Sequence, residues 1–504
     1  MCGKGAMGCV RAPVGPARVP ASLGGWRVGV SVPPTRRDWL RGLGGGAAAA
    51  AGAGFLSGCA GQAARPTGTG AKAVVVWSPI FQAWSGASQV SLKVLMSLAD
   101  RALAGFRSRH PSIEIRNWGP SRGATAVTTA LLAGAGPDVF ADNAVAPYLE
   151  QGLLVDLRPY MRRDNVSDAL FATSQLHVFS QGAGLYALPA YVGTVVMLVN
   201  EGLLDRLGQR YPAPDWTAAQ WAALARSTAG TVKGSSNAHR VGTTFFGAPA
   251  GFYYHGFGAA VVGSGGTTTD LNSASAYAAG RWLFDQLHSG VAANLGQQYQ
   301  AKFSSGLATT GSFWIQTLPA WVQTLSAMHW NFYPMPNWPV RPATFANSDF
   351  WAISAAAKHP QACWEVLREL CVAPTYQRTL MKAILFPPAL KSLWPDWPTV
   401  VRSVAPPLAH KNLEVFAQYV LHNQAYPSGV FRYADPQAWG LYGTAAGQMA
   451  AGRVGVRQGL RSVAQQIHAL EKQWAGTPAP NLKAEQAARR RAAQRLAGMF
   501  AVRG

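Results

Sequence analysis

The sequence predicts an α/β fold divided between two lobes. Strand and helix patterns alternate between residues 73 and 141, and this alternation favours a parallel sheet covered by helices on both faces. The chain has 504 residues, too many for one ordinary hydrophobic core, and 49% of them are apolar against 13% charged. These proportions exclude a disordered chain and allow two buried cores.

The elements follow one another in a regular order. A short apolar strand is expected at 73–77, and apolar residues at helical spacing predict a helix over 92–106. A second strand is expected at 113–117 and a second helix at 124–133. A Gly-Pro break then ends that helix, and residues 138–141 read as a third strand.

The carboxyl ends of these strands are the first candidate site. In parallel sheets, ligands gather at the carboxyl ends of the strands. Those ends are Trp77-Ser78 and Asp142-Asn143.

The N-terminal segment carries an export pattern. Thr35 to Arg41 resembles the twin-arginine signal through Arg36 and Arg37, and a short Gly/Ala-rich apolar run follows. Leu56 to Cys59 is similar to a bacterial lipobox, which is cut before the cysteine that then carries the lipid. We therefore expect residues 1–58 to be an N-terminal extension with its signal peptide.

Residues 59–72 form a small, polar stretch of the kind that tethers a folded body to a membrane. The expected location is the extracytoplasmic face of the cell membrane, with the chain secreted through the twin-arginine route and anchored by lipid at Cys59.

The net charge of +22 is partly concentrated at the two ends. No RNA-recognition signature, helix-turn-helix pattern or zinc-finger spacing accompanies it, so we expect no nucleic-acid partner. An acidic habitat, where few carboxylates are needed on the surface, is an open hypothesis for the charge. The basic tail at 476–504 is expected to be a solvated end, with contact to anionic lipid or to a membrane partner as the alternative.

Two cysteines fall within the expected globular body. Cys363 and Cys371 lie eight residues apart on a predicted helix, about 12 Å along its axis. A disulfide needs Cα atoms within about 7 Å, so we expect both to be free, buried thiols.

Several ordered motifs resemble one protein family. The first two run from Gly134 to Asn143 (GAGPDVFADN) and from Tyr148 to Leu157 (YLEQGLLVDL), and the next is Gly184 to Pro189 (GLYALP). Asn200, the run at 214–221 and weaker matches at 263–273, 303–314, 333–336, 348–354 and 360–372 follow in the same order. The sequence from residue 73 to 475 thus resembles the bacterial extracellular solute-binding proteins (family 1), which include the maltose- and oligosaccharide-binding proteins.

The resemblance implies a periplasmic-binding-protein-like fold, with two α/β lobes, a hinge and an interlobe ligand cleft. We expect the chain to cross between lobes near 189–193, 337–347 and 385–393. The implied lobe I is 73–189 plus 338–388, and lobe II is 190–337 plus 389–475.

The same resemblance implies a function in transport. The protein is expected to be the solute-binding component of an ABC importer, and its partners are a small-molecule solute and the permease subunits. A monomer without cofactor or metal is expected. A carbohydrate or similar polyhydroxy solute is favoured; a peptide, polyamine, phosphorylated polyol or iron chelate, or a structural surface lipoprotein, are the alternatives.

Sugar sites combine flat aromatic rings with a few hydrogen-bonding groups. The residues that fall where the family's cleft loops lie are Trp77, Ser78, Asp142, Asn143, Tyr191, Thr194, Phe313, Trp314, Phe350 and Trp351. Gly193 stands where some oligosaccharide binders carry a carboxylate, which argues against maltose-like specificity.

The sequence carries no pattern typical of an enzyme. It lacks a Gly-x-Ser-x-Gly elbow, a His-Glu-x-x-His pair and a phosphate-binding Gly-x-x-x-x-Gly-Lys loop in the expected body. The ten histidines show no metal-ligand spacing. We therefore expect a binding protein and no catalytic activity.

Overall fold

The computed structural model describes residues 73–118, 124–231, 239–245, 251–261, 269–293, 298–421, 425–427 and 435–475. All of them belong to the second of two units, which divide the chain at residue 63. The predictions for Arg36, Arg37, Cys59, the 59–72 tether and the 476–504 tail lie outside the described residues.

The first lobe is built on a sheet with five strands among the described residues, in the order β2-β1-β3-β14-β6. These strands are β1 (Ala73–Ser78), β2 (Ile113–Asn117), β3 (Val139–Asp142), β6 (Ala187–Pro189) and β14 (Phe350–Ile353). β1 pairs in parallel with both β2 and β3, as the alternating pattern predicts. The strands and helices expected from 73 to 141 are all present, within one to three residues of their expected ends.

One strand of the first sheet, β14, is antiparallel. β14 runs antiparallel to both of its neighbours, β3 and β6. It belongs to the chain that returns from the second sheet, so it starts at the edge where the other strands end. The parallel arrangement expected from residues 73 to 141 holds for β1, β2 and β3, and β14 adds an antiparallel strand that the sequence analysis did not address.

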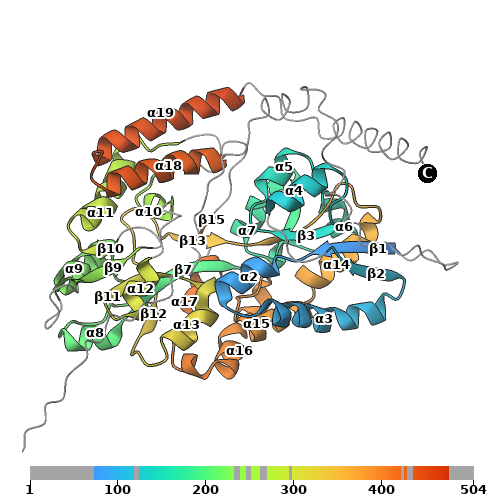
Figure 1. The fold of residues 1–504 in the computed structure, drawn as a ribbon, viewed down its shortest axis with the longest axis horizontal. Helices are drawn as coiled ribbons and strands as arrows, with labels where there is room; N and C mark the ends of the chain where they lie inside the picture. Colours follow the sequence, from blue (N-terminus) through green and yellow to red (C-terminus); the bar gives the residue numbers. More distant parts are fainter. Residues whose placement is uncertain are drawn as a thin grey trace, which may run out of the picture. The chain divides into compact units, whose positions relative to one another are not determined.

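Helices cover the first sheet. They are α2 (Phe81–Ser88), α3 (Leu92–Arg109), α4 (Ala124–Leu132), α5 (Ala146–Glu150), α6 (Arg158–Arg163), α7 (Thr173–Val178), α14 (Pro360–Cys371) and α15 (Pro374–Ile384), with the 3-10 turn η1 (Asp168–Leu170) and the hairpin β4 (Ser180–Gln181) and β5 (Gly184–Leu185). α3 begins at Ser91, whose side chain accepts a hydrogen bond from the Val94 N–H, and it buries one apolar face. α3 and α15 pack against each other beside this sheet (Figure 1).

The second lobe has a larger mixed sheet, with the order β10-β9-β11-β7-β13-β15 among the described residues; β12 also pairs with β7, and β8 with β9. The strands are β7 (Gly193–Val199), β8 (Gly230–Thr231), β9 (His239–Thr244), β10 (Ala292–Ala293), β11 (Ala308–Trp314), β12 (Asn331–Tyr333), β13 (Thr344–Asn347) and β15 (Ala425–Pro427). All seven residues of β7 are buried, as its apolar sequence GTVVMLV requires of a central strand.

The remaining helices pack around this sheet and between the lobes. They are α8 (Glu201–Arg206), α9 (Ala218–Thr228), α10 (Gly251–Gly256), α11 (Ala274–His288), α12 (Gln298–Ser304), α13 (Leu318–Thr324), α16 (Trp397–Val404), α17 (Val415–Leu421), α18 (Asp435–Ala450) and α19 (Val456–Ala475), with the 3-10 turns η2 (Ile315–Thr317), η3 (Lys391–Leu393) and η4 (Pro406–Leu408). α18 and α19, drawn in red, lie side by side and α19 also packs on α11 (Figure 1). Within the described ranges, none of the helices is long and apolar enough to cross a bilayer.

The chain passes between the two sheets at short segments. It leaves the first sheet after Pro189 and enters the second at Gly193. It returns between Asn347 and Phe350, later than the expected 337–347, because β13 still pairs with β7 of the second sheet. The expected start of the second part of lobe I, residue 338, therefore does not coincide with the change of sheet. The Pro387 carbonyl accepts a hydrogen bond from the Val192 N–H, so the 385–393 stretch runs beside the first crossing.

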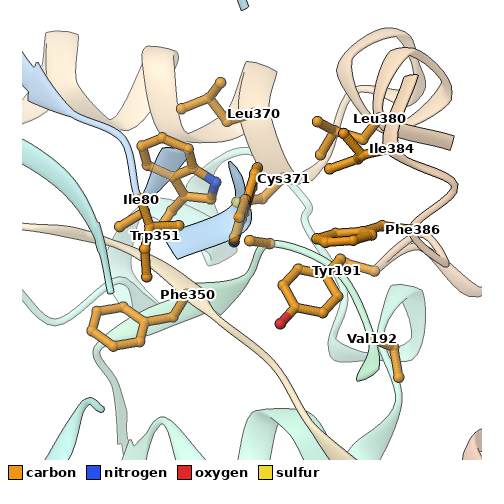
Figure 2. Close-up of a cluster of buried hydrophobic side chains, with 14 of the residues drawn as sticks. Ile80, Tyr191, Val192, Phe350, Trp351, Leu370, Cys371, Leu380, Ile384 and Phe386 are labelled. Carbon is orange, nitrogen blue, oxygen red and sulfur yellow. The ribbon is translucent and has the colours of Figure 1, made fainter. Parts of the chain in front are cut away.

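Each sheet is packed against a core of buried side chains. The first core runs from the first sheet past the crossings to one face of the second sheet, and the second core packs on the opposite face of β7 in the second lobe. Cys363 and Cys371 are free and buried on α14, which confirms the expectation of two unbridged thiols. Cys371 and Trp351 both belong to the first core (Figure 2).

Candidate functional site

The strand registers bring one edge of each sheet to the crossings. In the first sheet Phe350 pairs with Asp142 and with Pro189, so the ends of β3 and β6 meet the start of β14. In the second sheet Asn347 pairs with Gly193, and β11 ends at Trp314 opposite Val195. We call these strand ends, together with the crossing segments 190–192 and 348–349, the crossing edge.

Four of the predicted aromatic residues are core residues of the lobes. Trp77 is 5% exposed and its ring stacks on Trp351 with centroids 6.0 Å apart. Phe350 is fully buried among Phe140, Tyr148 and Phe179. Phe313 packs against Trp321, Phe332 and Phe416. In this structure none of these four rings presents an open face to a solute.

Three more predicted residues are buried by local contacts. Tyr191 packs on Phe386 (Figure 2), and their ring centroids lie 4.8 Å apart. The rings of Tyr191 and Trp84 make an edge-to-face contact. The Thr194 hydroxyl donates to the Phe416 carbonyl oxygen at 3.5 Å. Ser78 is 3% exposed. These three side chains stabilise the crossing edge from inside.

Two predicted residues remain accessible. Asn143 is exposed directly after β3, and its backbone N–H donates to the Asp142 carboxylate at 2.7 Å. Trp314 is half-buried at the end of β11 and packs against both cores. The two belong to different lobes.

Asp142 holds a buried carboxylate at the end of β3. It is 5% exposed and accepts a short hydrogen bond from the Tyr148 hydroxyl of α5. Burial raises the pKa of Asp142, while hydrogen bonds from Tyr148 and from the backbone of Asn143 and Ala144 oppose that rise. Burial and the nearby Asp142 charge also raise the pKa of Tyr148, so its hydroxyl stays a donor.

A second buried carboxylate, Asp349, lies in the return crossing and was missed from the sequence. It directly precedes Phe350, which pairs with Asp142 where β14 runs beside β3. The Trp84 indole N–H of α2 donates to it at 2.5 Å, and Tyr191 also donates to it. Burial raises the pKa of Asp349 to about 7; the Asp142 charge adds to that rise and the two hydrogen bonds oppose it.

The backbone of Asp349 joins the two crossings. Its carbonyl oxygen accepts the Ala190 N–H at 2.8 Å, and the Ser348 hydroxyl reaches the Tyr191 carbonyl oxygen at 2.5 Å. The position of Asp349 directly before Phe350 was the one available sequence signal. Trp84 carries no such signal, because nothing in the sequence of α2 distinguishes it from a core tryptophan.

The charged side chains described at the crossing edge are the carboxylates of Asp142 and Asp349. Of the described residues at these strand ends and crossings, none is Lys, Arg or His. Within the described ranges, no group of three or more His, Cys, Asp or Glu side chains could hold a metal ion.

Comparison with known families decides the identity of the chain. The profile of a family described as bacterial extracellular solute-binding protein matches residues 105–399, more than half of the chain and both crossings. The chain belongs to this family of solute-binding proteins. A protein of this extracellular family acts outside the cytoplasm.

Solved structures share the fold of this solute-binding protein. An ABC substrate-binding protein from Listeria monocytogenes in complex with cycloalternan has a TM-score of 0.63 and 16% identity, over 79% of this chain and 98% of that one. A cyclic alpha-maltosyl-1,6-maltose binding protein from Arthrobacter globiformis has a TM-score of 0.63 and 14% identity, over 79% and 99% of the two chains.

A third structure, UgpB from Mycobacterium tuberculosis in complex with glycerophosphocholine, has a TM-score of 0.62 and 16% identity, over 80% of this chain and 99% of that one. Among curated proteins, none matches this solute-binding protein by sequence. The two-lobed, periplasmic-binding-protein-like fold expected from the sequence is confirmed.

Proposed function

We propose that this solute-binding protein captures a carbohydrate, or a similar neutral polyhydroxy solute, between its lobes and delivers it to an ABC permease. The observation that carries the proposal is the family match across both crossings, since it includes the parts of both lobes that meet at the crossing edge. Several structures of the same fold are named for sugar ligands, among them cycloalternan, acarbose and mannotriose.

The chemistry of the crossing edge supports a neutral solute. Trp314 offers a half-buried ring and Asn143 an exposed amide, the two kinds of group that sugar sites combine. The carboxylates of Asp142 and Asp349 are buried and occupied by internal donors. We therefore assign the solute contacts first to Trp314 and Asn143, with Ser78 and Tyr191 as supports behind them.

A phosphorylated polyol is the second candidate. Glycerophosphocholine is the ligand named for the Mycobacterium tuberculosis structure, which resembles this chain as closely as the sugar binders do. A phosphate favours Lys or Arg partners. The described residues of the crossing edge provide neither, so the carbohydrate is favoured.

The anchoring and export route are also proposals. The Arg36-Arg37 pair directs a folded chain across the membrane, and Cys59 then carries the lipid that holds it at the outer face. We propose that the anchored protein acts as a monomer without catalytic activity. Replacing Cys59 by serine should release the protein from membranes, whereas replacing Arg36 and Arg37 by lysine should leave it in the cytoplasm.

A thermal-shift screen tests the solute. The purified protein is heated with maltose, mannotriose, a cyclic glucan, glycerophosphocholine, a peptide mixture and spermidine. A bound solute at one hundred times its dissociation constant stabilises the folded state by about 2.7 kcal/mol, so one neutral sugar should raise the melting temperature clearly. A shift with glycerophosphocholine alone would favour the second candidate, and a shift with none would contradict solute capture from this set.

Two variants then test the contacts. Trp314→Ala and Asn143→Ala should each weaken binding of the sugar found in the screen by tenfold or more, because each removes one side of the site (about 1.4 kcal/mol per tenfold). Trp439→Ala and Asn272→Ala are matched controls, since Trp439 is half-buried on α18 and Asn272 is exposed before α11. Equal affinity in the site variants and the controls would contradict the assignment.

A further inference from the structure

The return crossing places a carboxylate where an ionised group is poorly supported. Asp349 is 3% exposed, and its hydrogen bonds come from uncharged donors, the Trp84 indole and the Tyr191 hydroxyl. Burial of an ionised carboxylate without a cation costs several kcal/mol, so such groups bind a proton instead. A neutral Asp349 is therefore the form that suits this packing.

The groups that face Asp349 come from every element around it. α2 provides Trp84, the first crossing provides Tyr191, and the end of β3 provides Asp142, which is itself bonded to Tyr148 of α5. None of these described groups is a cation, and Asp142 is a like charge. Burial and that like charge raise the pKa of Asp349 to about 7, against the two hydrogen bonds.

The same residue joins the two crossings. The Asp349 carbonyl oxygen accepts the Ala190 N–H of the first crossing, and α2, which carries Trp84, packs on η2 and α13 of the second lobe. Water can reach an ionised Asp349 only if these contacts loosen. Loosening them frees the lobes to move apart, which is a hinge motion.

We propose that Asp349 is a proton-binding site in the hinge, and that release of its proton opens the lobes. The proton moves to bulk water, and no covalent bond other than O–H changes. The inference rests on the proposed function only in taking lobe closure as the capture step. Protonated Asp349 favours the packed crossing, and ionised Asp349 favours the loosened one.

Distance measurements between the lobes test this site in the full chain without any solute. Spin labels are attached at Arg162→Cys and Asn272→Cys, one exposed position on each lobe, after Cys2, Cys9 and Cys59 are replaced by serine. The two other cysteines are buried on α14 and stay unlabelled. We expect the distance distribution to change between about pH 5 and about pH 9, with a midpoint near neutral pH.

Three variants separate the proton site from a general effect of pH. Asp349→Asn mimics the protonated form and should keep the low-pH distribution throughout. Asp142→Asn removes the like charge and should move the midpoint to lower pH, whereas Trp84→Phe removes a donor to the ionised form and should move it higher. Asp285→Asn, an exposed carboxylate on α11, is the control and should behave as the wild type.

The outcomes test the proton site and the proposed solute-binding function independently of each other. A wild-type distribution that is constant with pH, or an Asp349→Asn variant that still changes, would overturn the proton site. If Asp349→Asn does not fold, the midpoint pH of Asp142→Asn and Trp84→Phe decides. Shifts of the midpoint in opposite directions support the proton site, and midpoints equal to that of the wild type overturn it. If a sugar binds but the distance distribution does not change with pH, the proposed function is retained and the proton site is rejected. If the distribution changes with pH but no sugar binds, the proton site is retained and the proposed function is contradicted.

Discussion

Trp351 and Trp364 are two fully buried tryptophans of the first lobe that differ in one contact. The Trp364 indole N–H donates to the Asp164 carboxylate at 2.7 Å. The Trp351 indole N–H has no partner among the described residues, although its ring stacks on Trp77. An unpaired buried donor costs free energy, so the two residues stabilise the lobe to different extents.

Replacement of each tryptophan by phenylalanine separates ring packing from hydrogen bonding. Both changes remove similar volume, but only Trp364→Phe breaks a hydrogen bond to a carboxylate, worth about 1.5–3 kcal/mol. We expect Trp364→Phe to lower the free energy of unfolding in urea by at least about 1 kcal/mol more than Trp351→Phe. Equal losses would mean that the Trp351 indole N–H has a partner such as a water molecule.

At the scale of elements, local sequence accounts well for where the helices begin. α9 starts with a capping box: the Thr217 hydroxyl accepts the Gln220 N–H, and the Gln220 side chain accepts the Thr217 N–H. α14 and α15 both carry proline in their first turn, where no N–H is needed. These signals are encoded within four residues, so they can be predicted without the tertiary structure.

The capping box of α9 makes a prediction of its own. Thr217→Ala removes the acceptor for the Gln220 N–H and should lower the free energy of unfolding by about 1 kcal/mol. Thr324→Ala is the control, because the Thr324 hydroxyl only bonds within the exposed last turn of α13. A Thr217→Ala variant as stable as this control, measured by urea unfolding, would argue that the cap contributes nothing to the lobe.

For the whole molecule, buried ionisable groups link folding to pH. The folded pKa of Asp349, about 7, lies above the ordinary value of 3.8, so the folded state binds this proton more tightly. The stability from this group is therefore fully present below about pH 4 and is lost as pH rises through 7. His255 acts in the opposite sense, because burial and the Arg341 charge lower its pKa to about 4, and its contribution is lost as pH falls.

Comparison of the wild type with Asp349→Asn separates the pH effect of Asp349 from that of His255. The difference in unfolding free energy between variant and wild type should shift in favour of the variant by up to about 4 kcal/mol between about pH 4 and about pH 8. Urea unfolding at five pH values measures it, with Asp285→Asn as the parallel control. A difference that does not vary with pH would show that Asp349 does not bind its proton more tightly in the folded state.

The candidate site shows where prediction from sequence stops. The position of Asn143 after a strand and of Trp314 at a family motif sufficed to select them, and both are accessible. The same reasoning selected Trp77 and Phe350, which the structure packs into the first core. The sequence at the end of a strand does not show which of two neighbouring residues faces the core, because this depends on the register between strands.

The sequence by itself determined the α/β alternation, the two free cysteines, the helix starts and the family. Those features depend on local periodicity, spacing and ordered motifs, all of which are readable along one chain. Only the tertiary structure decided that β14 runs antiparallel to β3, that the return crossing lies after Asn347, and that Asp349 meets Trp84 and Asp142. These are contacts between segments more than 150 residues apart, where burial and strand register, not local sequence, set the chemistry.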